Sequence, residues 1–174
     1  LTAIAAAATG QTRPLRLSVP TGLAPLLAPA LVTFQDRNPH LSVEVLATSQ
    51  PSDIAAGVAD IALRLAPTAD PALVVRTIGQ VGLSLYASPA YLRAHPVADP
   101  FSFAGHRLIG LHPDLGTTPA AHWINRHAGA ATVVMRLSQM AELRATAASG
   151  AGLALLPCIL TDGACDLIRV MPGV

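Results

Sequence analysis

The stretch LRLSVPTGLAPLLAPALVTFQDRNPHLSVEVL, residues 15–46, decides the fold class because it holds a strand, a helix and a second strand in succession. Residues 15–19 alternate apolar and polar side chains, the period of a β-strand. Pro20-Thr21-Gly22 turns the chain, and Thr21 is expected to cap a helix that runs to about Arg37. Asn38-Pro39 ends that helix, and residues 41–46 form the next strand. This unit is typical of a parallel sheet covered by helices.

The alternation of strands and helices continues along the rest of the chain. Ser138 is expected to cap the helix before Gly150, and Gly150 to end it. Further strands are expected at 60–65, 74–78, 83–87, 108–111, 132–136, 153–156 and 167–170, and helices at 53–58, 89–95, 118–126 and 139–148. The whole pattern predicts an α/β protein in which one strand–helix series follows another.

Composition favours a folded binding domain over a nucleic-acid binder. The chain has 174 residues, of which 52% are hydrophobic and 12% charged, enough for one domain or for two small lobes. All eleven basic residues are arginines, scattered from Arg13 to Arg169, so no cluster would follow a phosphate backbone. The absence of lysine excludes a P-loop and a Schiff base with pyridoxal phosphate.

The two cysteines, Cys158 and Cys165, are too few for a disulfide scaffold. They are interpreted as free thiols in a reducing cytoplasm, with a redox role left open. No apolar run approaches the roughly 20 residues of a membrane helix, so no membrane association is expected. The Ala-rich residues 1–9 are predicted to form a helical tail. They lack the basic region of a signal peptide.

The residues that usually carry catalysis or bind metals do not form a recognisable set. His122 and His127 are five positions apart, which places them on different faces of a helix, so no metal site is expected. Gly150-Ala151-Gly152 follows a helix and precedes a strand, the reverse of a dinucleotide-binding loop. The carboxylates are solitary, and the chain has no Gly-x-Ser-x-Gly elbow. We therefore expect neither an enzyme nor a bound cofactor.

Four stretches, taken together and in this order, resemble the effector-binding domain of LysR-type transcription regulators. They are LRLSVP (15–20) followed by LLAP (26–29), Phe34 and Asn38-Pro39; DIAAG (53–57) leading to ADIALR (59–64); LYASPAYL (85–92); and GAGLALLP (150–157). The resemblance implies the type 2 periplasmic-binding-protein fold, with two Rossmann-like lobes, mixed sheets and a ligand cleft between the lobes.

The resemblance also implies a domain organisation. Residues 1–13 would end a linker helix, residues 14–80 with 166–174 would form the first lobe, and residues 81–165 the second lobe. The family continues with a strand and a helix that complete the first lobe, so either the chain is truncated after Val174 or it is an atypical member. A DNA-binding helix-turn-helix would precede Leu1.

In such a fold the ligand is held at the carboxyl ends of strands and at helix N-termini. The expected effector-binding residues are Thr21, Gly22, Thr48, Ser49, Arg64, Ala87, Ser88, His112, Ser138 and Gln139. Hydroxyls and helix-start amides suit a carboxylate or a similar anion, and Arg64 adds a bidentate donor. Structural alternatives remain open: Thr21 and Ser138 as plain helix caps, and Arg64 as an ion-pair partner of Asp60 or Asp53.

The function implied by the resemblance is that of a cytoplasmic sensor. A small-molecule effector would bind a homodimer or homotetramer, which would contact DNA only through the N-terminal domain. In the dimer, the helix at 23–34 would pack near the partner's helix at 139–148. Two alternatives stay open: a periplasmic solute-binding protein of the same fold, and an enzyme on this fold that would depend on Arg64 and His112.

Overall fold

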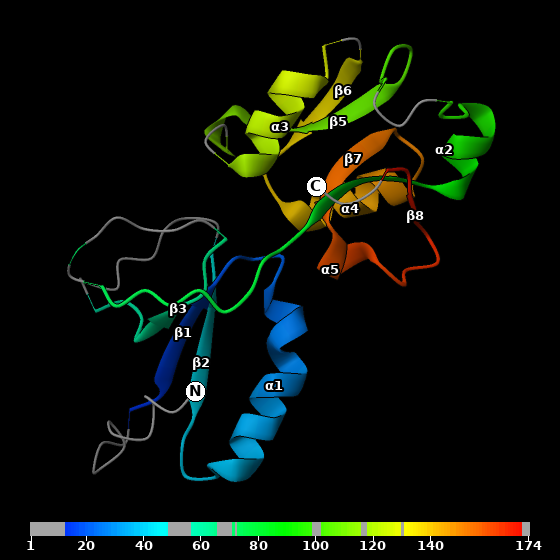
Figure 1. Ribbon diagram of the computed structural model, residues 1–174. Helices are drawn as coiled ribbons and strands as arrows, with labels where there is room; N and C mark the ends of the chain where they lie inside the picture. Colours follow the sequence, from blue (N-terminus) through cyan, green and yellow to red (C-terminus); the bar gives the residue numbers. More distant parts are fainter. Residues whose placement is uncertain are drawn as a thin grey trace. The chain divides into compact units, whose positions relative to one another are not determined.

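The computed structural model describes residues 13–48, 57–65, 71, 73–98, 102–115, 118–129 and 131–171 (Figure 1). The chain divides into two compact units, residues 1–74 and 75–174, and each unit contains its own β-sheet. The predicted α/β class with two sheets is confirmed.

The first unit is the strand–helix–strand arrangement predicted from residues 15–46. Strand β1 (Leu15–Val19) lies between β2 (Val43–Ala47) and β3 (Ile61–Ala62), and both neighbours run parallel to it. Helix α1 (Ala24–Arg37) connects β1 to β2. The expected helix at 53–58 falls mostly outside the described residues.

The boundaries of the first unit differ from the prediction in two places. Thr21 is not the cap of α1, because a turn closed by the bond from Leu23 N to Pro20 O (2.9 Å) delays the helix and makes Leu23 its N-cap residue. Strand β3 has two residues instead of the six expected. Residues 74–78, predicted as a strand, join neither sheet, and Val74 and Ile78 are exposed.

The second unit contains the remaining elements in alternating order. They are β4 (Leu83–Ala87), α2 (Pro89–Ala94), β5 (Arg107–Leu111), the 3-10 helix η2 (Pro113–Leu115), α3 (Pro119–His127), β6 (Thr132–Leu137), α4 (Met140–Ala148), β7 (Leu153–Pro157), α5 (Cys158–Thr161) and β8 (Ile168–Arg169). The four-residue helix α5 was not predicted, because so short a segment carries no helical periodicity.

The five-stranded sheet of this unit is mixed, with the strand order β6-β5-β7-β4-β8. Strands β6, β5 and β7 run parallel, whereas β4 is antiparallel to β7 and to β8. Leu83 at the start of β4 pairs with Pro157 at the end of β7, and Tyr86 pairs with Ala154. The carboxyl end of β4 therefore lies at the edge of the sheet where β5 and β7 begin.

The end of the described chain belongs to the second unit, although residues 166–174 were assigned to the first lobe from the sequence. Arg169 pairs with Tyr86, and Val170 N donates to Leu85 O at 2.8 Å. The backbone pairing to β4 thus overturns that assignment for residues 166–171. A two-residue strand carries no sequence signal for the sheet that it joins.

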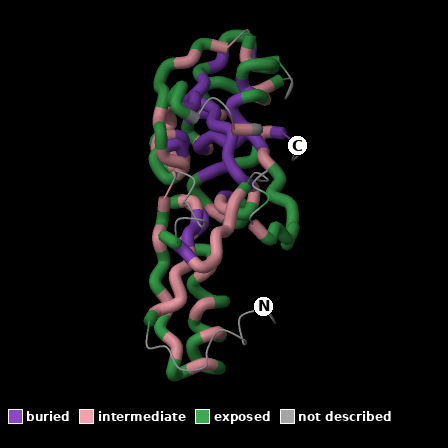
Figure 2. Tube along the Cα trace, turned by 90° about the vertical axis from the view of Figure 1, so that its left-hand side faces the viewer, coloured by how far each residue is buried: buried purple, intermediate pink, exposed green. Residues whose placement is uncertain are grey.

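Burial is distributed unequally between the units (Figure 2). In the second unit, buried side chains from β4, β5, β7, α3 and α4 form one hydrophobic cluster that includes Leu85, Ile109, Leu143 and Leu155. In the first unit, the described buried residues are Ser18, Val19, Leu23 and Ala59, and α1 contributes none of them. Within the described ranges, no helix is both long and apolar enough to span a membrane.

Candidate functional site

The predicted binding residues of the first unit meet at the carboxyl edge of its sheet. Thr48 follows β2, and its N–H donates to Val19 O (2.9 Å) at the end of β1. Thr21 and Gly22 lie in the turn that leaves β1, and Arg64 lies just beyond β3. Because all three strands are parallel, the segments that follow them share this edge. Ser49 lies outside the described residues.

Arg64 makes three hydrogen bonds to described residues at this edge, all to neutral oxygen atoms. Its Nη1 donates to Leu63 O (2.6 Å) and to Ser18 O (3.2 Å), and its Nη2 donates to Ser18 Oγ (2.8 Å). Desolvation lowers the pKa of Arg64. A guanidinium has five N–H donors, and two of them have no acceptor among the described residues.

Asp60 does not neutralise Arg64, which excludes one of the alternatives left open by the sequence. Its carboxylate pairs with Arg13 (2.9 Å) and Arg16 (3.5 Å) and accepts the Arg16 backbone N–H (2.9 Å). These contacts, led by the hydrogen bond from Arg13, lower the pKa of Asp60 to about 2. Asp53 lies outside the described residues. Among those that are described, no carboxylate pairs with Arg64.

Three predicted residues of the second unit lie together where β5 and β6 end. His112 follows β5, and its N–H donates to Leu137 O (2.8 Å), the residue before Ser138. Gln139 is the N-cap residue of α4 and makes no side-chain capping bond, so the prediction that Ser138 caps this helix is wrong. The first amides of α4 therefore depend on partners other than a capping side chain.

Ala87 and Ser88 are not at that edge. Ala87 is the last residue of β4 and Ser88 follows it, and the antiparallel direction of β4 places both where β5 and β7 begin. Ala87 is fully buried, and Ser88 caps α2 by accepting a hydrogen bond from Tyr91 N at 3.1 Å. The geometry gives Ser88 a structural role and separates both residues from His112, Ser138 and Gln139. The sequence predicted a strand here but not its direction.

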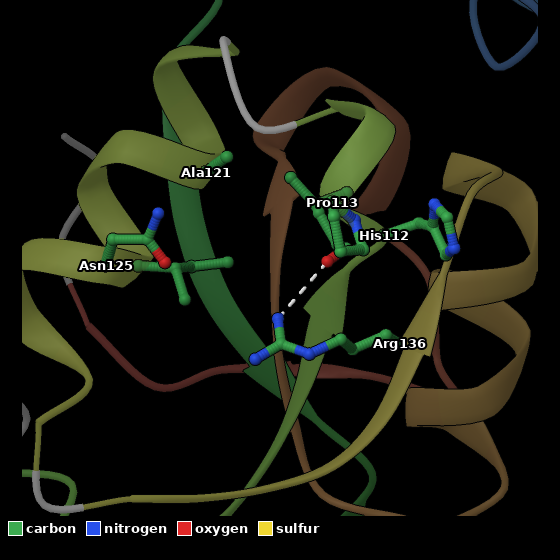
Figure 3. Close-up of a pocket in the computed structure, with 7 residues that line it drawn as sticks. His112, Pro113, Ala121, Asn125 and Arg136 are labelled. Atoms are coloured by element: carbon green, nitrogen blue, oxygen red, sulfur yellow. Dashed lines mark hydrogen bonds between the residues drawn. The ribbon is translucent and has the colours of Figure 1, made fainter.

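A cavity of about 360 Å³ in the second unit contains polar residues that the sequence did not suggest. Its lining residues are Leu111, His112, Pro113, Ala121, Ile124, Asn125 and Arg136 (Figure 3). The His112 imidazole points away from Asn125 and Arg136, and its Nδ1 lies 3.1 Å from Asp114 Oδ2. Arg136 and Asn125 come from different elements, so no local pattern could have joined them.

Comparisons with known proteins agree with this architecture. A regulatory domain of CrgA from Neisseria meningitidis, a LysR-type transcriptional regulator, superposes with a TM-score of 0.76 at 24% identity, covering 91% of this chain and 81% of that one. The regulatory domain of CcmR from Synechocystis PCC6803, solved in complex with 2-PG, gives a TM-score of 0.73 at 20% identity over 90% of this chain and 79% of that one.

Two curated relatives match part of the chain. An uncharacterized HTH-type transcriptional regulator of Haemophilus influenzae is 37% identical over 84 residues, and one of Xanthomonas campestris pv. campestris is 30% identical over 99 residues. These matches cover 48% and 56% of this chain, but only 29% of each relative's length. The model of the LysR substrate binding domain matches residues 8–173, and the chain therefore belongs to this family.

Proposed function

We propose that this chain is the effector-sensing domain of a LysR-type transcription regulator and that its effector is a small anionic metabolite. The family match supports a binding role rather than a catalytic one. The curated relatives are described as HTH-type transcriptional regulators, which favours the regulator over a periplasmic solute-binding protein. The inference of an anionic ligand rests on the charge of Arg64, which is not neutralised by any carboxylate in the described part of the chain.

The position of Arg64 makes an anion the favoured ligand on physical grounds. Partial burial removes water from the guanidinium, and its three neutral acceptors return only part of the lost solvation energy. A carboxylate or phosphate at the two remaining donors would form charge-assisted hydrogen bonds. Because Ser18 and the strand backbone fix the guanidinium, little side-chain entropy would be lost when the anion binds.

The other expected effector-binding residues suit the same chemistry. Thr21 and Thr48 carry hydroxyls at the edge of the first sheet. In the second unit, Ser138, Gln139 and the first amides of α4 offer hydrogen-bond donors and the positive end of a helix dipole. Ser49 remains a predicted contact of the same ligand.

Effector binding would be transmitted to an N-terminal DNA-binding domain in the longer protein. A coupling free energy of about 1–3 kcal/mol would be enough to change operator occupancy several-fold. The regulator would act in the cytoplasm as a homodimer or homotetramer. Helix α1, with Leu26 and Val32 exposed, offers an apolar surface for that assembly.

The test is a thermal-shift screen of this chain against small carboxylates, phosphorylated acids, amino acids and neutral sugars, followed by calorimetry on each hit. A ligand at a hundred times its Kd stabilises the folded state by about 2.7 kcal/mol. We expect anionic hits whose affinity falls at least tenfold in Arg64→Gln and less in Arg64→Lys.

The matched control is Arg37→Gln, which removes an exposed arginine of the same unit and should leave affinity within twofold. Circular dichroism confirms that each variant is folded. Hits confined to neutral molecules, or a screen in which no anionic hit loses affinity in folded Arg64→Gln, would refute the proposed effector class.

A further inference from the structure

We infer that the second unit carries a separate binding site, built on Arg136 and Asn125, for a small molecule that combines a carboxylate with a compact apolar body. The site is the cavity of about 360 Å³ between α3 and the ends of β5 and β6 (Figure 3). It shares no residue with the Arg64 edge of the first sheet. His112, an expected effector-binding residue, is among its lining residues, but the His112 imidazole points away from Arg136 and Asn125.

A β-bulge in β6 determines the face on which Arg136 lies. Val133 pairs with Leu108 and Met135 pairs with Ile109, so Val134 is an extra residue in this strand. In a regular strand, side chains three positions apart point to opposite faces. Because of the bulge, Val133 and Arg136 lie on the same face of the sheet as their β5 partners, Leu108 and Gly110. Bulges commonly redirect a side chain in this way next to functional sites.

Gly110 leaves room for Arg136 to lie across β5. A Cβ built on this glycine would lie 3.2 Å from Val133 Cγ1, 3.4 Å from Arg136 Nη1 and 3.7 Å from Arg136 Cγ. The arginine side chain therefore occupies the space that a residue larger than glycine would fill. Its Nη1 reaches Leu111 O at 3.4 Å, and the guanidinium lies beside the cavity.

The polar groups of the cavity are left with few partners in the described part of the chain. Leu111 O, at a long 3.4 Å, is the acceptor for Arg136, and no carboxylate there pairs with it. The nearby Asp114 pairs with His112 instead. Asn125 lies on α3 with its carboxamide across the cavity from Arg136, and this carboxamide makes no hydrogen bond with the residues described.

Besides Arg136, Asn125 and His112, the lining residues are apolar: Leu111, Pro113, Ala121 and Ile124. Small-molecule sites usually combine apolar lining residues with a few placed polar groups, and this cavity has residues of both kinds. Arg136 would hold the carboxylate, Asn125 would donate to the same group, and the apolar residues would contact the rest of the ligand. The cavity volume suits a molecule with a single small ring.

The probe is cyclohexanecarboxylate, and its uncharged counterpart cyclohexanecarboxamide is the matched ligand control. Neither absorbs where tryptophan does, and Trp123 on α3 is the chain's only tryptophan, so its fluorescence can follow binding alongside calorimetry. We expect saturable binding of the carboxylate and at least tenfold weaker binding of the amide.

The variants separate this site from the Arg64 site. We expect affinity for the carboxylate to fall at least tenfold in Arg136→Gln and about threefold in Asn125→Ala, an exposed position where folding should be unaffected. Arg126→Gln, an exposed neighbour on α3, and Arg64→Gln should each stay within twofold.

Three results would overturn the inference: no saturable binding, equal affinity for the amide, or a carboxylate affinity that Arg136→Gln and Asn125→Ala both leave unchanged. Loss of binding in Arg64→Gln alone would assign the probe to the first unit. That outcome would overturn this second site and leave the proposed effector site intact.

Discussion

The two units build parallel strands from similar sequence patterns but bury them to very different extents. All five residues of β7 in the second unit are buried, whereas none of the five in β2 of the first unit is. Helix α4 buries Leu143 and Ala147, while α1 buries nothing despite its leucines and valine. Since apolar burial is the main source of folding free energy, the second unit should be the stable part of the chain. An apolar pattern predicts an element but not how far it is covered.

The largest effect should come from truncating the core of the second unit. Leu155 in β7 is fully buried, so Leu155→Ala should lower the free energy of unfolding by about 3 kcal/mol. The matched truncation in the first unit is Val32→Ala on α1, where the side chain is 60% exposed and alanine favours the helix. That change should cost less than about 0.5 kcal/mol.

Urea denaturation followed by circular dichroism measures both variants. Equal losses in the two would show that α1 is covered in solution, and the contrast between the units would then have to be abandoned.

A smaller effect is expected at the helix starts of the second unit. Ser88→Ala removes the cap of α2 and should cost about 1 kcal/mol, whereas Ser138→Ala removes a hydroxyl that does not cap α4 and should cost little. Thermal unfolding of both variants, with and without an effector from the screen, measures whether each serine contributes to stability or to effector binding. Weaker effector binding in Ser88→Ala would return Ser88 to the binding site.

The smallest effect concerns acid sensitivity, which should be concentrated in the first unit. The pKa of Asp60 is lowered to about 2 from an ordinary value near 3.8. Its charged form therefore stabilises the folded state above about pH 4, and this contribution is lost as the pH falls from about 4 to about 2. Asp60→Asn should cost roughly 1 kcal/mol at pH 7 and little once the pH has fallen below about 2.

Hydrogen exchange of β1 amides as a function of pH measures this contribution, with β7 amides as the internal reference. Asp36→Asn, an exposed carboxylate change on α1, is the charge control. Acid sensitivity that is the same in β1 and β7, or that survives in Asp60→Asn, would contradict this role of Asp60.

Local patterns in the sequence predicted most elements of the fold. Strand β1 has the expected bounds because alternation and a following proline both mark it, and Thr118 and Gly150 lie at helix ends as their chemistry suggests. What the sequence could not supply was strand direction and pairing. The direction of β4 places Ala87 and Ser88 away from His112, Ser138 and Gln139 within the second unit, and the pairing of β8 assigns residues 166–171 to that unit.

The candidate site also depends on contacts that local sequence patterns do not predict. Arg64 was identified because it follows a short apolar strand, yet its freedom from Asp60 depends on Arg13 and Arg16, more than 40 positions away. Arg136 was missed because the bulge at Val134 changes the face on which it lies, and a bulge carries no reliable signal in a single sequence.

The same bulge also bears on how copies of this chain behave at high concentration. Strand β6 is an outer strand of its sheet, with Val134 and Met135 exposed side by side. A straight apolar strand in that position would be a template for edge-to-edge pairing and aggregation. The extra residue bends and twists this edge, which hinders a strand from another molecule from adding to it. The extra residue Val134 in β6 would thus place Arg136 beside the ligand cavity and also hinder aggregation through the edge of the sheet.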